Sequence, residues 1–537
     1  MPFDSILPTR SINHARPRRA LAGLLLLLAL AVSIRPAQAD DDALRQRLAG
    51  GVLRWGGDAE GGAPYQLRDP DDPGRIIGFE VELVDALAAR LAQRLGIALR
   101  ADFVQYEWVS LPLGLERGDF DLIASGFESS PQRAKMMRLS RAYYIARPEL
   151  AVRRGETRIR ELADLKDKAV GTLSASAAQR VLEELPAGSI VGFDGQVEPY
   201  LDLELGRLDA VLLDGPISIY YGRPNAKLTT RAVDAPSVEY VLALRPADKE
   251  LAAALDRALG EVIQTGELTR ILRRWHLWNA DQVSLAKGDA ELAALGFSPA
   301  GAALPLLMPV AAVDVNMLAS SARKWGFADY APLLGRGALM TLGLSLASMA
   351  LAITLGLLVC VARLYGPAPL RWAALAYVEL FRGLPLLLLL FFLYFGLAHY
   401  GVDLPAVQTA IIGFGLTYAA YEAEIYRSAI QSMPRGQWEA ALALGMSPAL
   451  AFRRIIFPQA LRAALAPMTN DFVALFKDTS LVSVIAVHEL TKEYLILSRS
   501  SLKFVELGLL TAVLYLAMSI PLGYLSRWLE QRWGPAR

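Results

Sequence analysis

The sequence is poor in three features that would each indicate a class of protein. It has one cysteine in 537 residues, Cys360, so no disulfide within the chain can stabilise it. It contains no Gly-Lys dipeptide, and therefore no phosphate-binding loop of the type that ends Gly-Lys-Ser/Thr. Its 55 basic and 54 acidic residues give a net charge of +1, so no overall positive field favours nucleic acid as a partner. The chain must fold through apolar cores, and it has no recognisable means of hydrolysing ATP.

Charge and hydrophobicity are distributed unevenly along the chain. From Asp40 to about Ala280, charged residues of both signs are interspersed as in a soluble globular protein. From Gly337 onward there are long apolar runs of the kind that cross membranes. A single core seldom exceeds about 250–300 residues, so this length favours at least two domains. The sequence predicts a soluble domain followed by a membrane domain.

The first 39 residues have the pattern of an export signal. A basic flank that includes Arg18 and Arg19 precedes an apolar core, Ala20–Val32, and Ala37–Ala39 supplies a small-residue cleavage pattern. An uncleaved membrane anchor is the alternative. Either interpretation places the following residues outside the cytoplasm.

Short apolar runs alternate with helical periodicity between residues 40 and 280. Gly51–Trp55, Phe120–Ala124 and Ala210–Leu213 are typical of strands. The segment after Gly78 has the spacing of an amphipathic helix that ends at Gly96. Strands that alternate with helices predict an α/β fold with largely parallel pairing.

Several runs in this half resemble, in family order, the periplasmic amino-acid-binding proteins of family 3. The matching runs are Ile77–Leu83, Leu115–Leu122, Ser129–Arg133, Leu205–Ala210 and Ile271–Trp275. The resemblance implies a bilobed fold over residues 40–280, in which two lobes close on an amino acid by a hinge motion.

The resemblance also assigns ligand-binding roles. Arg133 resembles the arginine that grips the α-carboxylate, a role that suits a planar group with two parallel donors. Asp214 resembles the acid that receives the α-ammonium. Both ends of a zwitterion need partners, because an unpaired buried charge is costly. The remaining expected contacts are donors at Ser176, Ser125 and Gly126, aromatic stacking by Trp108 and Tyr65, and an acid near that end of the cleft at Asp58.

Two positions depart from the family pattern. Glu128 stands five residues before Arg133, where relatives usually carry Ser or Thr. A carboxylate there would repel the ligand's own carboxylate unless it turns outward, pairs with Arg133, or meets an extra cation on the ligand. In addition, Gly61 and Gly62 occupy a stretch where many relatives place an aromatic residue. A basic or modified amino acid would fit this site, and the sequence does not choose between them.

Residues 281–336 lose clear periodicity and contain Gly, Pro, Ala and Ser, which predicts a linker. If flexible, some 50 residues have a root-mean-square span of about 40 Å. Such a tether would keep the binding domain at a high local concentration above the membrane domain.

Five apolar runs predict an all-α transmembrane domain over residues 337–537. With the binding domain outside, the loop that contains Arg363 and Arg371 is cytoplasmic, in agreement with the positive-inside tendency. Lys492, Arg499 and Lys503 fall on the predicted outer side, against that tendency. The predicted spans are 337–361, 373–397, 406–429, 467–487 and 508–525.

The most specific motif lies in the long predicted inner loop. It resembles the cytoplasmic loop of type I ABC importer permeases, with Phe457 where Leu is usual. Small residues on one face of a short helix would let that helix sit closely in a groove on a partner. The runs Tyr377–Leu386 and Phe476–Leu481 also resemble the polar-amino-acid branch of these permeases, which includes histidine, glutamine, arginine and opine systems. The motif residues are Glu439, Ala440, Ala441, Gly445, Ile455 and Pro458.

These resemblances imply a subunit of an ABC importer, and not an enzyme. It would capture a polar or charged amino acid in the periplasm and move it across the bacterial inner membrane. The chain itself would hold no cofactor and no metal. A separate cytoplasmic ATPase that contacts the Glu439 loop would bind ATP and Mg²⁺. Five spans make half a translocator, which implies a homodimer in contact with lipid.

A ligand-gated channel or sensor receptor with a bilobed domain is the alternative function. It predicts a re-entrant pore segment between spans or a cytoplasmic output domain.

Overall fold

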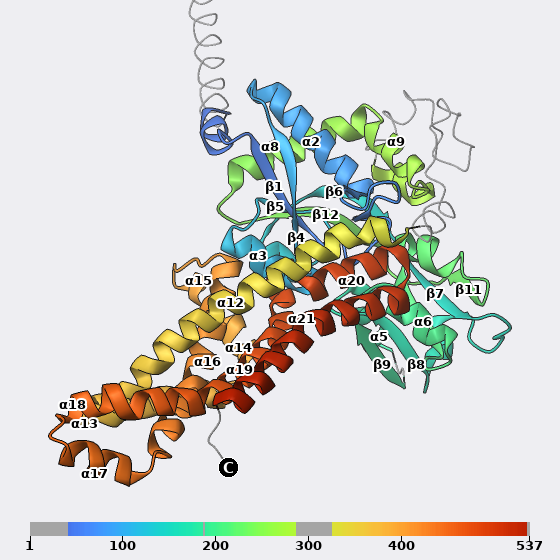
Figure 1. Cartoon of the computed structure of the whole chain (residues 1–537). Coiled ribbons are helices and arrows are strands. Elements are labelled where there is room, and N and C mark those ends of the chain that lie inside the picture. Colours follow the sequence, from blue (N-terminus) through green and yellow to red (C-terminus); the bar gives the residue numbers. More distant parts are fainter. Residues whose placement is uncertain (1–40, 186–187, 286–324, 534–537) are drawn as a thin grey trace, which may run out of the picture.

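The computed structural model describes residues 41–185, 188–285 and 325–533 as two α/β lobes followed by a helical domain (Figure 1). The predicted signal segment, 1–39, lies outside the described residues, as does most of the predicted linker.

The first lobe is built on a five-stranded sheet of order β4-β1-β5-β12-β6. The predicted helix after Gly78 is confirmed, since α2 runs from Phe79 to Leu95. Gly96 ends it with a left-handed φ of 65°, which glycine adopts without steric cost. The strands are β1 (Val52–Gly57), β4 (Arg100–Gln105), β5 (Leu122–Ile123), β6 (Arg138–Ala146) and β12 (Val238–Leu244). The other helices are α3 (Leu111–Arg117), α4 (Pro131–Met136), α8 (Lys249–Gln264) and α9 (Glu267–Arg274), and a small sheet pairs β2 (Leu67–Arg68) with β3 (Ile76–Ile77).

The second lobe is built on a five-stranded sheet of order β11-β7-β10-β8-β9. Its strands are β7 (Pro148–Arg153), β8 (Ala169–Leu173), β9 (Ser189–Phe193), β10 (Ala210–Asp214) and β11 (Leu228–Ala232). Its helices are α5 (Ala177–Glu183), α6 (Glu198–Glu204) and α7 (Gly215–Ile217).

Strand pairing is mixed and not largely parallel as predicted. Strand β1 is parallel to β4 and β5, and β8 is parallel to β9 and β10. However, β12 is antiparallel to β5 and β6, and β7 is antiparallel to β10 and β11. The chain passes to the second lobe between β6 and β7 and returns between β11 and β12. The returning strand therefore enters the first sheet against the direction of its neighbours.

The helical domain contains two helices long and apolar enough to cross a membrane within the described ranges, or three if one bent pair is a single span. The predicted count of five spans is therefore not confirmed. The first and last predicted runs lie in α12 (Phe327–Tyr365) and α21 (Phe504–Trp533). The remaining helices are α13 (Ala368–Gly383), α14 (Leu386–Phe391), α15 (Leu397–His399), α16 (Ala406–Gln431), α17 (Arg435–Ala443), α18 (Pro448–Ala451), α19 (Phe457–Asp478) and α20 (Leu490–Ser501).

Two boundaries differ from the prediction. The second predicted run is one span in sequence, but the chain bends by 105° between α13 and the helices that follow. Leu384, the residue before Pro385, is extended, because the proline ring disfavours a helical conformation there. In addition, α12 begins at Phe327, inside the segment predicted as linker. Its first turn is capped by Asp329, which accepts a hydrogen bond of 2.7 Å from the backbone nitrogen of Gly326.

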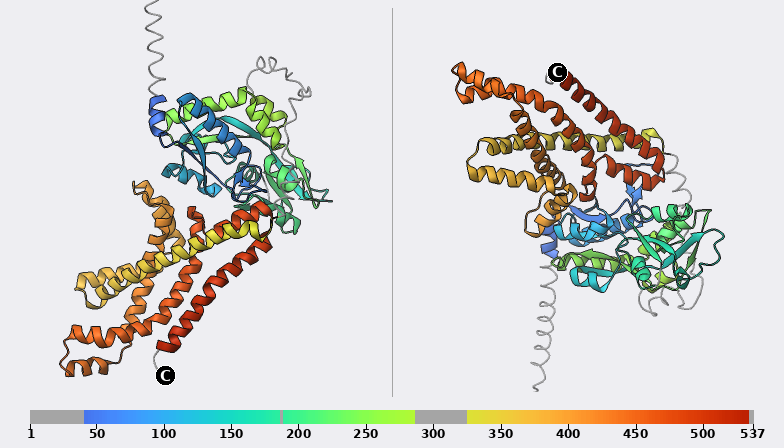
Figure 2. Two further views of the ribbon diagram at one scale, coloured as in Figure 1. Left: turned by 45° about the horizontal axis from the view of Figure 1, so that its top comes forward. Right: turned by 90° about the horizontal axis from the view of Figure 1, so that it is seen from below.

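The helical domain presents two different ends. Figures 1 and 2 show α20 against the two lobes, and α17 and α18 at the end of the domain farthest from them. The motif loop and the binding lobes therefore lie at opposite ends of the helical domain.

Candidate functional site

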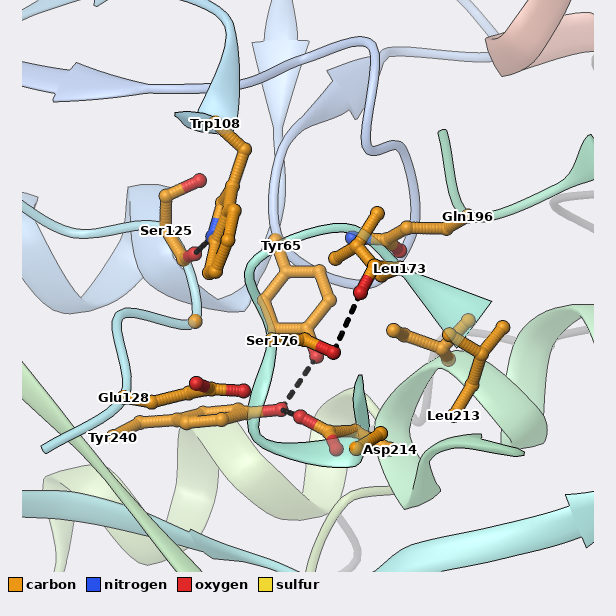
Figure 3. A pocket seen from close by; sticks show the side chains of 13 residues that line it. Tyr65, Trp108, Ser125, Glu128, Leu173, Ser176, Gln196, Leu213, Asp214 and Tyr240 are labelled. Atoms are coloured by element: carbon orange, nitrogen blue, oxygen red, sulfur yellow. Dashed lines mark hydrogen bonds between the residues drawn. The ribbon is translucent and has the colours of Figure 1, made fainter. Parts of the chain in front are cut away.

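A pocket of about 310 Å³ lies between the two lobes. Figure 3 shows the rings of Trp108 and Tyr65 and the carboxylates of Glu128 and Asp214 around it. Seven of the nine residues predicted to bind ligand line this pocket: Tyr65, Trp108, Ser125, Gly126, Glu128, Ser176 and Asp214. Arg133 and Asp58 are not among the lining residues.

Hydrogen bonds join the first lobe directly to the second lobe across this pocket. Glu128 of the first lobe accepts hydrogen bonds from the backbone nitrogen of Ala177, at 2.7 Å, and from Arg180, at 3.0 Å. Tyr240, on β12, donates its hydroxyl proton to Asp214 at the end of β10. The structure is therefore a closed arrangement of the lobes, held in part by a carboxylate that belongs to the protein.

The buried Glu128 also holds Arg133. The guanidinium of Arg133 lies 3.5 Å from the Glu128 carboxylate and donates to the Glu128 backbone oxygen at 2.8 Å. It also stacks over the ring of Phe127, with 4.2 Å between the guanidinium carbon and the ring centroid. Of the alternatives that the sequence left open, the structure adopts pairing with Arg133. The pairing keeps the arginine out of the pocket lining, where it was expected to meet the ligand.

The three predicted donors near Glu128 already have partners. Ser176 donates its hydroxyl proton to the backbone oxygen of Leu173 at 2.7 Å, and Ser125 donates to Gln66 at 3.3 Å. The Gly126 nitrogen donates to the buried carboxylate of Glu80 at 2.6 Å. All three residues line the pocket, but none presents a free donor in this structure.

Asp214 is the carboxylate with spare capacity in the pocket. It is 7% exposed, and its Oδ1 has no hydrogen-bond partner among the described residues. Burial, and next the nearby charge of Glu128, raises the pKa of the Asp214 carboxyl to about 7. The Tyr240 hydroxyl that binds its Oδ2 lies 2.9 Å from the hydroxyl of Tyr65. Asp214 Oδ1 can therefore accept a further hydrogen bond, and its role toward the α-ammonium stays a prediction.

Asp58 braces the pocket wall and does not face the ligand space as predicted. Its carboxylate accepts hydrogen bonds from Gln105 and from the backbone nitrogens of Glu60 and Trp108, each at 2.9 Å. Burial, followed by the charge of Glu60, raises the pKa of Asp58 to about 6. The indole nitrogen of Trp108 in turn donates to the backbone oxygen of Ser125 at 3.0 Å. Asp58 thus positions one aromatic wall of the pocket.

The glycines that replace the family aromatic allow the lobes to approach closely. Gly62 has a φ of 77°, and a Cβ there would collide with the hydroxyl of Tyr221 from the second lobe. That hydroxyl accepts a hydrogen bond of 2.8 Å from the backbone nitrogen of Ala63. An aromatic side chain at this position would hold the lobes apart.

We predict that Asp214→Asn stabilises the unliganded protein at alkaline pH. The folded-state pKa of about 7 lies above the ordinary value of 3.8, so the stability linked to the protonated carboxyl is present below about pH 4 and is lost as the pH rises through 7. Three pKa units correspond to roughly 4 kcal/mol, an upper limit for the effect. Thermal unfolding of the purified chain should show a higher midpoint for the variant at pH 8 and equal midpoints near pH 4. Equal midpoints at pH 8 would contradict the burial of an ionised Asp214.

The lobes rest on α20 of the helical domain through an ion-pair cluster. Lys492 is fully buried and lies 2.5 Å from Glu60 of the first lobe and 3.3 Å from Glu107. Arg499 lies seven residues further along α20. It pairs with Glu60 and, at 2.8 Å, with Glu198 of the second lobe. One helix of the helical domain therefore binds carboxylates from both lobes.

Two further contacts join the lobes to the helical domain. Arg68 donates to Glu493 of α20 at 3.0 Å. Arg117 donates to the backbone oxygens of Tyr394 and Leu404, at 2.6 and 2.8 Å, and lies over the Tyr394 ring. This surface was not predicted from the sequence. The available signal was the presence of basic residues on the predicted outer side, of which Lys492 and Arg499 meet acidic partners hundreds of positions earlier in the chain.

The motif loop forms α17 and an exposed turn. Gly445 has a φ of 78°, and hydrogen bonds from Gly445 to Leu442 and from Met446 to Ala441 close the end of α17. Glu439, Ala440 and Gly445 are exposed, whereas Ala441 is 3% exposed and packs against its own domain. The predicted small-residue face is therefore divided. The exposed surface includes Leu444, which is 83% exposed.

Comparisons with known proteins match both halves of the chain. Residues 53–277 match the family of bacterial extracellular solute-binding proteins, family 3. Residues 349–535 match the family described as binding-protein-dependent transport system inner membrane component.

Individual relatives align with the second half. A probable amino-acid ABC transporter permease protein of Bacillus subtilis, YckA, is 42% identical over 35% of this chain and 83% of that protein. The glutamine transport system permease protein GlnP of Escherichia coli is 36% identical over 37% of this chain and 93% of that protein. Among solved structures, an ancestral arginine-binding protein bound to arginine is 27% identical, covers 42% of this chain and 98% of its own, and has a TM-score of 0.39.

Proposed function

This chain belongs to the amino-acid ABC transporter permeases and carries a family 3 solute-binding domain on the same polypeptide, and from this premise we propose how its parts act in import. It is a membrane-embedded subunit of an amino-acid ABC importer. The ligand binds in the pocket between the lobes, where Asp214 accepts its ammonium and Trp108 and Tyr65 contact its apolar part. Relatives named for glutamine and cystine support a small polar substrate.

The observation that carries the proposal is the double attachment of α20. Arg499 pairs with Glu60 of the first lobe and Glu198 of the second, so both carboxylates are in reach only when the lobes are closed. An open domain would lose one of these pairs and would dock less tightly. We infer that α20 binds the closed lobes more tightly than the open lobes. The closed domain then delivers its ligand to the helical domain.

The far end of the helical domain is where the driving subunit would bind. The loop of α17 lies opposite the lobes and exposes Leu444 and Ala440 around Gly445. Exposed apolar residues next to small ones suit a groove on a partner. We propose that a separate cytoplasmic ATPase, which itself binds ATP and Mg²⁺, binds this loop. We also propose that the chain is a homodimer with five membrane spans in each subunit. It would lie in the bacterial inner membrane with its lobes in the periplasm.

This function is tested by uptake into proteoliposomes that contain the purified chain and a candidate cytoplasmic ATPase. Radiolabelled standard amino acids, agmatine and cadaverine form the panel of substrates. At least one compound should accumulate when ATP is supplied on the ATPase side, and accumulation should stop with a non-hydrolysable ATP analogue. Accumulation that is unaffected by the analogue would contradict the proposal.

A further inference from the structure

Most hydrogen-bond donors around the pocket have partners within the protein, whereas two acceptors have none among the described residues. The side-chain donors of its hydroxyl and indole groups all have acceptors within the protein, as the dashed bonds in Figure 3 illustrate. These donors and their acceptors are Ser125 to Gln66, Ser176 to Leu173, Trp108 to Ser125, Tyr240 to Asp214, and Tyr65 to the Tyr240 oxygen. The Gly126 nitrogen is likewise bound to Glu80. Apart from the amide of Gln196, the lining side chains offer a ligand no hydrogen-bond donor.

The pocket atoms without a hydrogen-bond partner in the described part of the chain are acceptors. Asp214 Oδ1 and Gln196 Oε1 are buried and have no partner among the described residues, and both residues line the pocket. Each residue is 7% exposed, so water cannot readily satisfy these atoms. A buried acceptor without a partner is costly, and a ligand that donates hydrogen bonds would relieve that cost.

A carboxylate of the protein itself already occupies the groups that would bind a ligand carboxylate. Glu128 is 2% exposed and takes the Ala177 nitrogen, Arg180 and Arg133 together. Two cations and one backbone donor compensate this single negative charge. A ligand carboxylate placed here would lie against Glu128 and would compete with it for the Ala177 nitrogen and the two arginines, and two carboxylates in contact repel strongly.

We propose that the pocket selects an organic ammonium that lacks a free α-carboxylate, such as the amine or amide derived from an amino acid. Glu128 supplies the carboxylate that an ordinary amino acid would bring, and it ties the first lobe to Ala177 and Arg180 of the second. Asp214 accepts the ammonium, with Trp108 and Tyr65 as aromatic walls beside the positive charge. This inference rests on the proposed function in that the pocket is the transport site, and it changes the expected substrate from an amino acid to an amine or amide derived from one.

Calorimetric titration of the full chain in lipid nanodiscs tests the inference with matched pairs that differ only by the carboxylate. The pairs are arginine and agmatine, lysine and cadaverine, and histidine and histamine. At least one amine should bind about tenfold or more tightly than its parent acid, because the carboxylate of the acid is repelled by the buried carboxylate of Glu128. Asp214→Asn should abolish that binding.

Variants at Glu128 provide the complementary test. Glu128→Ser removes the internal carboxylate and should raise the affinity for the parent acid at least about tenfold relative to the amine. Retained binding of the amine shows that the variant is folded. Glu128→Gln keeps the size of the side chain and one acceptor oxygen without its charge, so it can retain only one of the two hydrogen bonds from Ala177 and Arg180, and it should shift the preference in the same direction.

The possible failures are distinct. An acid that binds wild type as tightly as its amine, and loses binding in Asp214→Asn, overturns the inference and leaves the pocket as the transport site. A Glu128→Ser variant that binds the amine with an unchanged preference also overturns it. No Asp214-dependent binding by any member of the panel overturns both the inference and the proposed site.

Discussion

Replacement of Lys492 by methionine is expected to abolish most uptake and to leave the pocket able to bind ligand. Lys492 is fully buried beside Glu60 and Glu107, so the methionine keeps the apolar stem and leaves the buried carboxylate of Glu60 and the half-buried carboxylate of Glu107 without this cation. Loss of one partner of a buried ion pair costs about 3–5 kcal/mol, and this is an upper limit here because Glu60 keeps Arg499; the full cost would lower the docked population on the order of 100-fold or more. Uptake into proteoliposomes measures the loss, and calorimetry of the same protein measures ligand affinity.

The matched control is Lys249→Met on α8 of the first lobe, which removes an exposed lysine that has no part in this cluster. Surface charges of this kind contribute about 0–1 kcal/mol, so uptake should be near wild type. The predicted linker would keep the binding domain near the helical domain, and it would therefore reduce the effect without removing it. Wild-type uptake by Lys492→Met would show that the α20 surface is not the docking surface in the working cycle.

Gly445→Asp is expected to abolish uptake and ligand-stimulated ATP hydrolysis without affecting ligand binding in the pocket. The backbone φ of 78° is left-handed, a conformation that aspartate, like asparagine, tolerates better than most L-residues, so the expected effect comes from the charge that it adds to an exposed turn beside Leu444. Uptake should fall to background, and ligand-stimulated ATP hydrolysis should be lost, because the loop no longer seats in its partner. Ligand affinity measured by calorimetry should be unchanged, since the pocket lies at the other end of the molecule.

Gly445→Asn is the control for this substitution. Asparagine tolerates the left-handed conformation better than other side chains and carries no charge. It should retain a large part of the uptake that Gly445→Asp loses. Equal activity of wild type and Gly445→Asp would contradict a partner-binding role for the loop.

Local features of this protein could be predicted from the sequence because neighbouring residues determine them. The helix from Phe79 to Leu95 was predictable because its apolar spacing and the glycine that ends it lie within one short segment. The pocket residues Asp214, Trp108 and Tyr65 were identified through a resemblance that covers the whole first half, and the structure brings them together.

Features that depend on distant residues were not predicted. The state of Glu128 depends on Ala177 and Arg180, and only the fold shows that these atoms reach it. Lys492 appeared as an exception to the charge pattern of membrane proteins, because its partner Glu60 lies 432 positions earlier in the sequence. The antiparallel strand β12 likewise follows from the return of the chain to the first lobe, which no local pattern encodes.

The central claim is that the chain is a transporter that a separate ATPase drives, and omission of that ATPase from the proteoliposomes tests it most directly. Vesicles with the chain alone should hold no more labelled substrate than empty vesicles, even with ATP present. Addition of the ATPase should produce accumulation against a gradient. Equal accumulation by the chain without any ATPase would contradict the account.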